Sequence, residues 1–143
     1  MELHKITADL SVASQLDAAA LPHLAEQGFR SIVCNRPDAE APGQPDFGSV
    51  EKAAAALGIK AVYQPVPSNA VSDADGAAFG KLLDELPKPI LAYCRSGTRC
   101  TVLWALSEAP KRPYKDIVLQ AMRAGYDLTG LTPRLQKLYK AVT

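Results

Sequence analysis

Apolar runs alternate along this chain with longer segments of mixed polarity. Five short runs are predicted strands; they lie at residues 2–6, 10–14, 29–35, 59–66 and 90–94. The run at 29–35 is continuous in apolar character, which is typical of a buried strand. Between and after them, glycine, proline and capping residues delimit predicted helices from about Leu21 to Gln27, over 50–58, from Ser72 or Asp73 to Leu86, over 100–109, from Pro113 to Ala124, and over 132–142 with Thr132 as cap. The pattern predicts an α/β fold, with a largely parallel central sheet flanked by helices, as a single domain over residues 1–143.

Composition narrows the class of protein without identifying an activity. Of the 143 residues, 48% are hydrophobic and 22% are charged, which is ordinary for a globular protein. A formal net charge of +1 gives no electrostatic case for binding nucleic acid or an acidic membrane surface. No apolar run is long enough to cross a bilayer, and the first ten residues lack the hydrophobic stretch of a signal peptide. We therefore expect a cytoplasmic protein with neither nucleic acid nor membrane among its partners.

The cysteines do not suggest a structural role for disulfides or metal. Cys34, Cys94 and Cys100 form an odd, widely spaced set, unlike a disulfide framework. A structural zinc site needs four closely paired ligands, and His4 and His23 are far from the later cysteines in sequence. We expect no metal and no cofactor.

The segment that follows the last predicted strand carries the clearest chemical signal. Cys94 ends that strand, and residues 95–99 read Arg-Ser-Gly-Thr-Arg before the next helix. A short loop that wraps into a helix N-terminus directs backbone N–H groups inward and forms an anion-binding nest. Gly97 lets the backbone curl where a Cβ would clash. Nest, helix dipole and arginines should lower the pKa of Cys94, which makes it the candidate nucleophile.

Side-chain chemistry suggests a role for each loop residue. Arg99 is the second candidate catalytic residue, and its guanidinium is expected to point into the loop, either holding the loop closed or binding the substrate's oxyanion. Arg95 is expected to face outward and attract an anion. The predicted substrate-binding set is Arg95, Ser96, Gly97 and Thr98.

A purely structural cysteine is the alternative at each of these positions, because free cysteine is among the most buried residue types. At Cys94 that alternative leaves two arginines around a glycine unexplained, so the nucleophile is favoured. At Cys34 no such setting exists and the structural role is favoured. Cys100 is a candidate second thiol that could resolve a persulfide, although packing beneath the loop is the favoured role.

Other polar and aromatic residues have simpler expected roles. Trp104 and Leu106 are expected in the core, on the helix behind the loop. Three polar residues stand at the end of the strand at 29–35 or just after it: Asn35, Arg36 and Glu40. One expectation is that they border the pocket, and the favoured one is that an ion pair among them shapes the loop.

The number of residues in the loop separates two enzyme families. The pattern resembles the Cys-Arg-x-Gly-x-Arg loop of rhodanese sulfurtransferases, whose cysteine carries a persulfide. Cysteine-dependent phosphatases have five residues between cysteine and arginine, usually with a histidine before the cysteine. Here four residues separate Cys94 from Arg99, Cys100 occupies the phosphatase arginine position, and Tyr93 stands in the place of the histidine.

The order of motifs along the whole chain resembles a dual-specificity-phosphatase scaffold instead. More closely, it is similar to the bacterial beta-lactamase-hydrolase-like, phosphatase-like domain family, through the segments at 10–16, 28–40, 58–66, 89–106 and 124–135. Members of that family occur alone or fused to a persulfide dioxygenase, so the resemblance implies sulfide or persulfide metabolism and a dioxygenase-type partner. The family usually has serine after the loop arginine, where this chain has Cys100.

A phosphatase also needs a general acid to protonate its leaving alcohol. Asp73 and Asp75 are the candidates, but both are better explained as acids of a helix cap and first turn. Sulfur transfer expels sulfite or a thiolate, which need little proton donation, so a missing acid is less damaging to it.

Three hypotheses follow for a small anionic substrate such as thiosulfate, a persulfide or a phosphate ester. The first is a sulfurtransferase that works through a Cys94 persulfide. The alternative is a dual-specificity-like phosphatase that works through a phosphocysteine at the same residue. A third and weakest hypothesis is an anion-binding module without catalysis.

Overall fold

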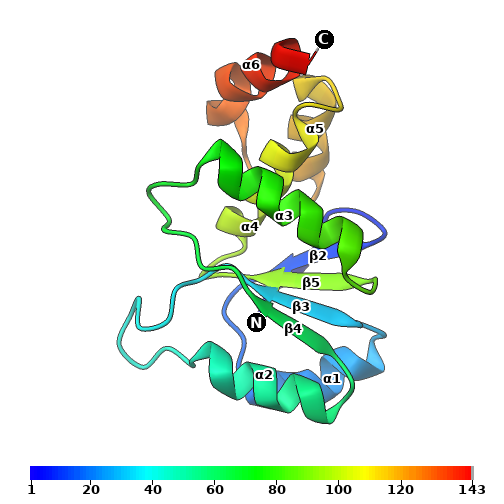
Figure 1. Cartoon of the computed structure of the whole chain (residues 1–143), viewed down its shortest axis with the longest axis vertical. Coiled ribbons are helices and arrows are strands. Elements are labelled where there is room, and N and C mark those ends of the chain that lie inside the picture. Colours follow the sequence, from blue (N-terminus) through cyan, green and yellow to red (C-terminus); the bar gives the residue numbers. More distant parts are fainter. Residues whose placement is uncertain (143) are drawn as a thin grey trace.

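A five-stranded sheet forms the centre of the molecule (Figure 1). The computed structural model describes residues 1–142, so Thr143, the last residue of the predicted domain, lies outside the described residues. The strands have the spatial order β1-β2-β5-β3-β4, and only β1 runs antiparallel to its neighbour. Their bounds are Leu3–Lys5 (β1), Leu10–Ala13 (β2), Ser31–Cys34 (β3), Lys60–Tyr63 (β4) and Ile90–Tyr93 (β5). The predicted α/β class with a largely parallel sheet is confirmed.

The central strands end level with one another. Tyr93 pairs with Ala13 of β2 on one side and with Cys34 of β3 on the other. Beyond these pairs the ladder continues for one more bond on each side, since the Cys94 N–H donates to the Ala13 carbonyl (3.2 Å) and the Asn35 N–H to the Tyr93 carbonyl (2.9 Å). The segments that leave β2, β3 and β5 therefore meet at one edge of the sheet, the edge where ligands bind in open α/β folds.

Helices cover the two faces of the sheet unequally (Figure 1). One face carries α1 (Leu21–Glu26) and α2 (Phe47–Ala56), preceded by the short 3-10 turn Ala18–Ala20. On the other face lie α3 (Asp73–Glu85) and α4 (Thr98–Glu108), and beyond them α5 (Tyr114–Arg123) and α6 (Thr132–Val142). Within residues 1–142, no helix is both long enough and apolar enough to cross a membrane.

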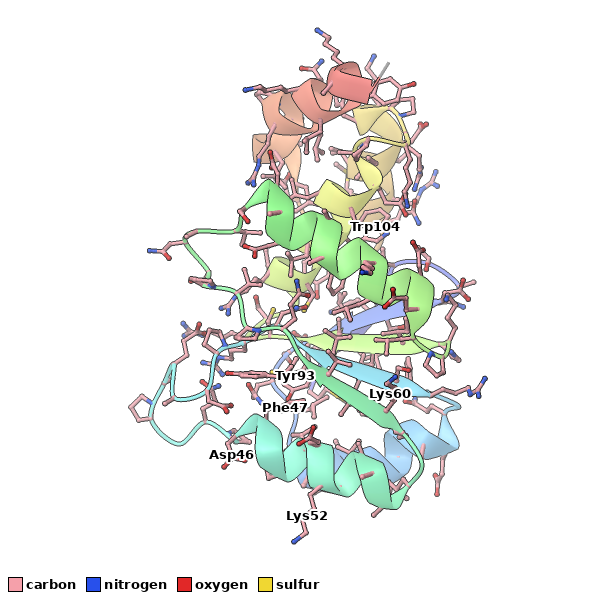
Figure 2. All side chains as sticks on the ribbon, in the orientation of Figure 1. Asp46, Phe47, Lys52, Lys60, Tyr93 and Trp104 are labelled. Atoms are coloured by element: carbon pink, nitrogen blue, oxygen red, sulfur yellow. The ribbon has the colours of Figure 1, made fainter. Side chains whose placement is uncertain are left out.

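The period-two alternation of β5 divides its side chains between two cores. Leu91 and Tyr93 pack in the core beneath α1 and α2, whereas Ile90, Ala92 and the following Cys94 pack in the core beneath α3 and α4. Figure 2 shows Tyr93 on the α2 side of the sheet and Trp104 on the α3 side. As predicted, Trp104 and Leu106 are core residues of α4.

Helix starts differ from the sequence prediction in two places. Helix α2 begins at Phe47 rather than at residue 50, because Asp46 caps it by accepting the Ser49 N–H at 2.8 Å. Helix α4 begins at Thr98 rather than Cys100, because Gly97 in a left-handed conformation ends the loop earlier. The predicted cap of α3 is correct: Ser72 and Asp75 form a reciprocal capping box.

Candidate active site

The loop between β5 and α4 curls around the sulfur of Cys94. Gly97 has φ = 89° and is the N-cap of α4, and its backbone N–H donates to Cys94 Sγ at 3.1 Å. The thiol is therefore held beneath the N-terminus of α4, where the helix dipole favours negative charge. This is the nest expected from the sequence.

Several hydrogen bonds keep Cys94 ionised. The largest contribution is a hydrogen bond from the Cys100 thiol, and backbone N–H groups of Cys100, Ser96 and Gly97 add to it. Together they outweigh burial, which acts in the opposite direction, and lower the pKa of Cys94 to about 5. Cys94 is consequently a thiolate at neutral pH, the form that attacks electrophiles.

Cys100 is the donor in this pair. Its side chain is fully buried, and burial raises the pKa of its thiol well above the ordinary value. It therefore keeps its proton and offers it to the Cys94 thiolate. The favoured expectation of packing beneath the loop is correct for its position, but the thiol also contacts the reactive sulfur.

Gly97 is required by its surroundings as well as by its dihedral angle. A Cβ at this position would collide with the hydroxyl of Tyr126, which lies against the loop. That hydroxyl donates to the Ser96 carbonyl at 3.1 Å, and burial raises the pKa of Tyr126 to about 12, so the donor proton is retained. Tyr126 thus supports the loop from outside, a role that its isolated position in the sequence did not reveal.

Arg99 is arranged differently from the prediction. Its guanidinium makes a bidentate ion pair with Glu40, with Nη1 to Oε2 at 3.1 Å and Nη2 to Oε1 at 3.0 Å. Nη1 also donates to the Val66 carbonyl at 2.9 Å. Among the described residues, no hydrogen bond joins this side chain to a carbonyl of loop 94–98, so its contacts do not support the alternative in which Arg99 holds the loop closed, and binding of the substrate's oxyanion stays a prediction. The hydrogen bonds of its guanidinium go to Glu40 and to backbone carbonyls outside the loop.

One donor of Arg99 is left over for a ligand. The side chain is buried, and its Nε is a buried nitrogen without a hydrogen-bond partner among the described residues. An orphaned buried donor of this kind is costly unless a ligand or water pairs with it. Since Arg99 and Cys94 line the same cavity, an oxyanion above the thiolate is a suitable partner.

Glu40 organises a second arginine as well. Arg36 donates through Nε to Glu40 at 2.9 Å and through Nη1 to Gln15 at 3.2 Å. The predicted ion pair in this segment is therefore present, with Arg99 as a third member. The hydrogen bonds from Arg99 and Arg36 lower the pKa of Glu40, so its carboxylate stays ionised.

A cavity of about 590 Å³ opens above the loop. Its lining includes Cys94 and, from the predicted substrate-binding set, Arg95, Ser96 and Thr98. Arg95 is exposed, and the hydroxyls of Ser96 and Thr98 are joined by a hydrogen bond of 3.1 Å. The remaining lining residues come from the loop after β3, the segment after β4, α4, the 3-10 turn before α6 and the start of α6: Arg36, Glu40, Ala41, Ser68, Asn69, Ala70, Val71, Arg99, Val102, Leu131 and Arg134.

The two candidate general acids do not line this cavity. Asp73 accepts from Arg134 Nε at 2.7 Å, and Asp75 is occupied in the capping box of α3. Of the residues that line the cavity, Glu40 alone carries a carboxylate, and it is held by two arginines. The preference for structural roles at Asp73 and Asp75 agrees with these contacts.

Comparison with known proteins places the fold among phosphatases. Residues 2–111 match the family model of the beta-lactamase hydrolase-like protein, phosphatase-like domain. A beta-lactamase hydrolase-like protein from Agrobacterium fabrum is 35% identical over 99% of this chain, which spans 33% of that relative. The chain thus covers about a third of the length of the curated relatives that it matches.

Solved structures extend the comparison. A candidate phosphatase from Neisseria meningitidis has a TM-score of 0.86 and 34% identity, with 96% of this chain and 99% of that chain covered. Tk-PTP in its active form has a TM-score of 0.71 and 18% identity over 96% of both chains, a likeness of fold alone.

Proposed function

Because this chain belongs to the phosphatase-like domain family of beta-lactamase hydrolase-like proteins, we propose that it hydrolyses phosphate monoesters through a covalent Cys94 intermediate. The observation that carries the proposal is the Cys94 thiolate on the wall of a cavity that Arg99, whose Nε has no partner among the described residues, also lines. The family and the cysteine-phosphatase-like fold favour this reaction over the sulfur transfer that the loop count first suggested.

The proposed hydrolysis has two steps, and both use the Cys94 sulfur. The Cys94 thiolate attacks phosphorus, the S–P bond forms, and the bond from phosphorus to the ester oxygen breaks. Negative charge then moves from sulfur towards the phosphoryl oxygens and the departing ester oxygen, and the backbone N–H groups that surround Cys94 are the donors available to stabilise it. Water attacks the phosphocysteine in the second step, and a thiolate with a pKa of about 5 is a good leaving group.

The surroundings of the thiolate restrict the alcohol that can leave. The only carboxylate that lines the cavity within the described residues is Glu40, which is ionised and already accepts from Arg36 and Arg99. Since it has no proton to donate, the best substrates are esters of acidic alcohols such as phenols, which leave without protonation.

Turnover of 4-nitrophenyl phosphate tests the proposal. Wild-type protein should release nitrophenol steadily near pH 6, and Cys94→Ser should abolish release. The matched control, Cys34→Ser, should retain it, because Cys34 lies outside the cavity lining. Mass spectrometry after a rapid acid quench should show a phosphoryl group on Cys94. The absence of turnover between pH 5 and 7 contradicts the proposal.

Sulfur transfer remains the second candidate, favoured by the four-residue spacing between Cys94 and Arg99 and by the lack of a free acid. In this reaction the thiolate attacks the outer sulfur of thiosulfate, sulfite leaves, and Cys94 becomes a persulfide. A persulfide dioxygenase, the partner implied by the resemblance, belongs with this candidate. Formation of thiocyanate from thiosulfate and cyanide, with one added sulfur on Cys94, would support it.

A further inference from the structure

The cavity wall beyond the loop comes from a part of the chain outside the family match. The matched segment ends at residue 111, whereas the cavity is also lined by Leu131, the last residue of the 3-10 turn Thr129–Leu131, and by Arg134 in the first turn of α6. The cavity around the reactive loop is therefore completed by residues that the family model does not include. What these residues bind decides which substrates fit.

Arg134 is held in place with part of its guanidinium unused. Nε donates to Asp73 at 2.7 Å and Nη2 to the Val71 carbonyl at 2.7 Å. The third nitrogen, Nη1, has no hydrogen-bond partner among the described residues. Two fixed contacts orient the group at low entropic cost, so the free N–H groups are available for an oxyanion.

The charges around the cavity favour an anion with more than one charged group. Four arginines line it, Arg36, Arg95, Arg99 and Arg134, against the single carboxylate of Glu40. Even when Asp73 is counted behind Arg134, arginines exceed carboxylates by two (4 − 2 = 2), while the whole chain has a formal net charge of +1. Positive charge is thus concentrated here, and Arg95 has no carboxylate partner among the described residues.

The cavity is also far larger than the reacting group. Its volume of about 590 Å³ corresponds to roughly twenty water molecules at about 30 Å³ each. A phosphoryl group fills a small part of this space, and the rest can hold the organic part of a substrate. Arg134 is therefore available to that organic part, because the reacting group itself is held by the β5–α4 loop.

We infer that the substrate carries a second anionic group on its organic part and that Arg134 is the specificity residue that binds this group. The identity of the reacting group as a phosphate ester rests on the proposed function, but the second anion site does not. An anion bound by Arg134 is charge-assisted, so it should strengthen binding by about tenfold.

Binding of two matched esters to the Cys94→Ser variant tests this inference without interference from turnover. The probes are phenyl phosphate and 4-carboxyphenyl phosphate, which differ by one carboxylate, with titration calorimetry as the measurement. The carboxylated ester should bind about tenfold more tightly, and adding Arg134→Gln should reduce the ratio to near one. Phenyl phosphate itself should bind as before. Arg123→Gln, an exposed arginine on α5, is the control and should leave the ratio unchanged.

A second variant separates binding from a structural role of the ion pair. Asp73→Asn removes the carboxylate that competes for Arg134, so it should raise the preference for the carboxylated ester. If the ion pair only shaped the cavity wall, this variant would lower the preference as Arg134→Gln does. Equal affinity of Cys94→Ser for the two esters, a preference that survives Arg134→Gln, or no binding of the carboxylated ester overturns the inference.

The two proposals fail in different ways. Wild-type protein that binds both esters with the expected preference but hydrolyses neither contradicts the phosphatase proposal alone. Hydrolysis of both esters without a preference in binding contradicts the second anion site alone.

Discussion

Cys34 and Cys94 occupy similar places in the fold and have opposite chemistry. Each lies at the carboxyl end of a parallel strand, in β3 or directly after β5, and each is buried, with 2% and 1% of its surface exposed. Burial raises the pKa of the Cys34 thiol, whereas the pKa of Cys94 is lowered to about 5. Burial alone therefore does not decide whether a strand-end cysteine is reactive.

The segment that follows each strand explains the difference. Cys34 packs in the core under α1 and α2, and its thiol donates to the Arg36 carbonyl at 3.3 Å. A carbonyl acceptor favours the protonated thiol. Cys94 lies one residue past Tyr93, the partner of Cys34 in the sheet, and packs on the opposite face. Its sulfur accepts hydrogen bonds from backbone N–H groups because the loop after it turns immediately into α4. A hydrogen bond with Tyr93 also acts to lower the pKa of Cys34, but burial outweighs it there, whereas the donors around Cys94 outweigh burial; the balance between donors and burial therefore sets the chemistry.

Reaction with iodoacetamide should show the largest contrast. At pH 7 Cys94 is almost fully ionised, whereas a thiol with a pKa above 9 is at most about 1% thiolate. Peptide mass spectrometry should find Cys94 modified faster than Cys34, because the thiolate is the reacting form and Cys94, unlike Cys34, lines the cavity. Equal rates at the two positions would remove the basis of the comparison.

Gly97→Ala should deform the loop that makes the difference. A left-handed alanine costs about 1–2 kcal/mol, and here its Cβ would also collide with the Tyr126 hydroxyl. We expect urea denaturation to show a loss of about 2–4 kcal/mol in the free energy of unfolding together with slower alkylation of Cys94.

Gly58→Ala is the matched control for that substitution. Gly58 has φ = +73° with nothing within 4 Å of the added Cβ, so the variant carries the backbone cost alone. Adding Tyr126→Phe to Gly97→Ala removes the hydroxyl that the Cβ would meet. The double variant should therefore regain the stability that Gly97→Ala loses beyond Gly58→Ala. If both glycine variants lose the same unfolding free energy, the collision with Tyr126 does not contribute to the loss in Gly97→Ala.

Replacing Cys100 tests the donor side of the hydrogen bond. Cys100→Ala removes the donor that contributes most to the low pKa of Cys94, so the midpoint of the pH–rate profile for alkylation should rise. A rise of about one pH unit corresponds to ~1.4 kcal/mol, the size of one charge-assisted hydrogen bond. Cys100→Ser retains a donor and should leave the midpoint nearly unchanged. A common shift in both variants would indicate a packing effect instead.

The pH dependence of stability is a further consequence of the low pKa of Cys94. The pKa of Cys94 is about 5 in the folded state against an ordinary value of 9.0, so between these pH values the unfolded chain binds a proton that the folded chain does not. Stability therefore rises with pH in this window, by at most about 1.4 kcal/mol per unit, and the contribution is lost as pH falls through 5. Cys94→Ser should have a shallower slope between pH 5.5 and 8 in urea denaturation, and an unchanged slope would contradict a thiolate in the folded protein.

Features determined by neighbouring residues were predictable from the sequence. The apolar runs located the strands, Ser72 marked the start of α3, and the segment around Gly97 indicated the nest. Each depends on residues within a few positions of one another, for which the local pattern is informative.

Contacts between distant segments were not predictable. The spatial order of the strands, the Arg99–Glu40 pair and the Tyr126–Ser96 hydrogen bond join positions separated by tens of residues. For this reason Arg99 was assigned to the loop, since the sequence shows its neighbours but not Glu40, 59 positions earlier. The missed members of the site, Gln15, Tyr126 and Arg134, stand in segments that carry the family resemblance, but no neighbouring residue in the sequence indicates their contacts.

The Tyr126 hydroxyl gives the segment before α6 a part in the reactivity of a cysteine 32 positions earlier (126 − 94 = 32). A fragment cut at the end of the family match would keep Cys94, Gly97 and Arg99 yet lose the side chain that rests on their loop. The smallest piece of this chain able to perform the chemistry is accordingly longer than residues 2–111, and a loop grafted onto another scaffold would also need an aromatic side chain in the place of Tyr126.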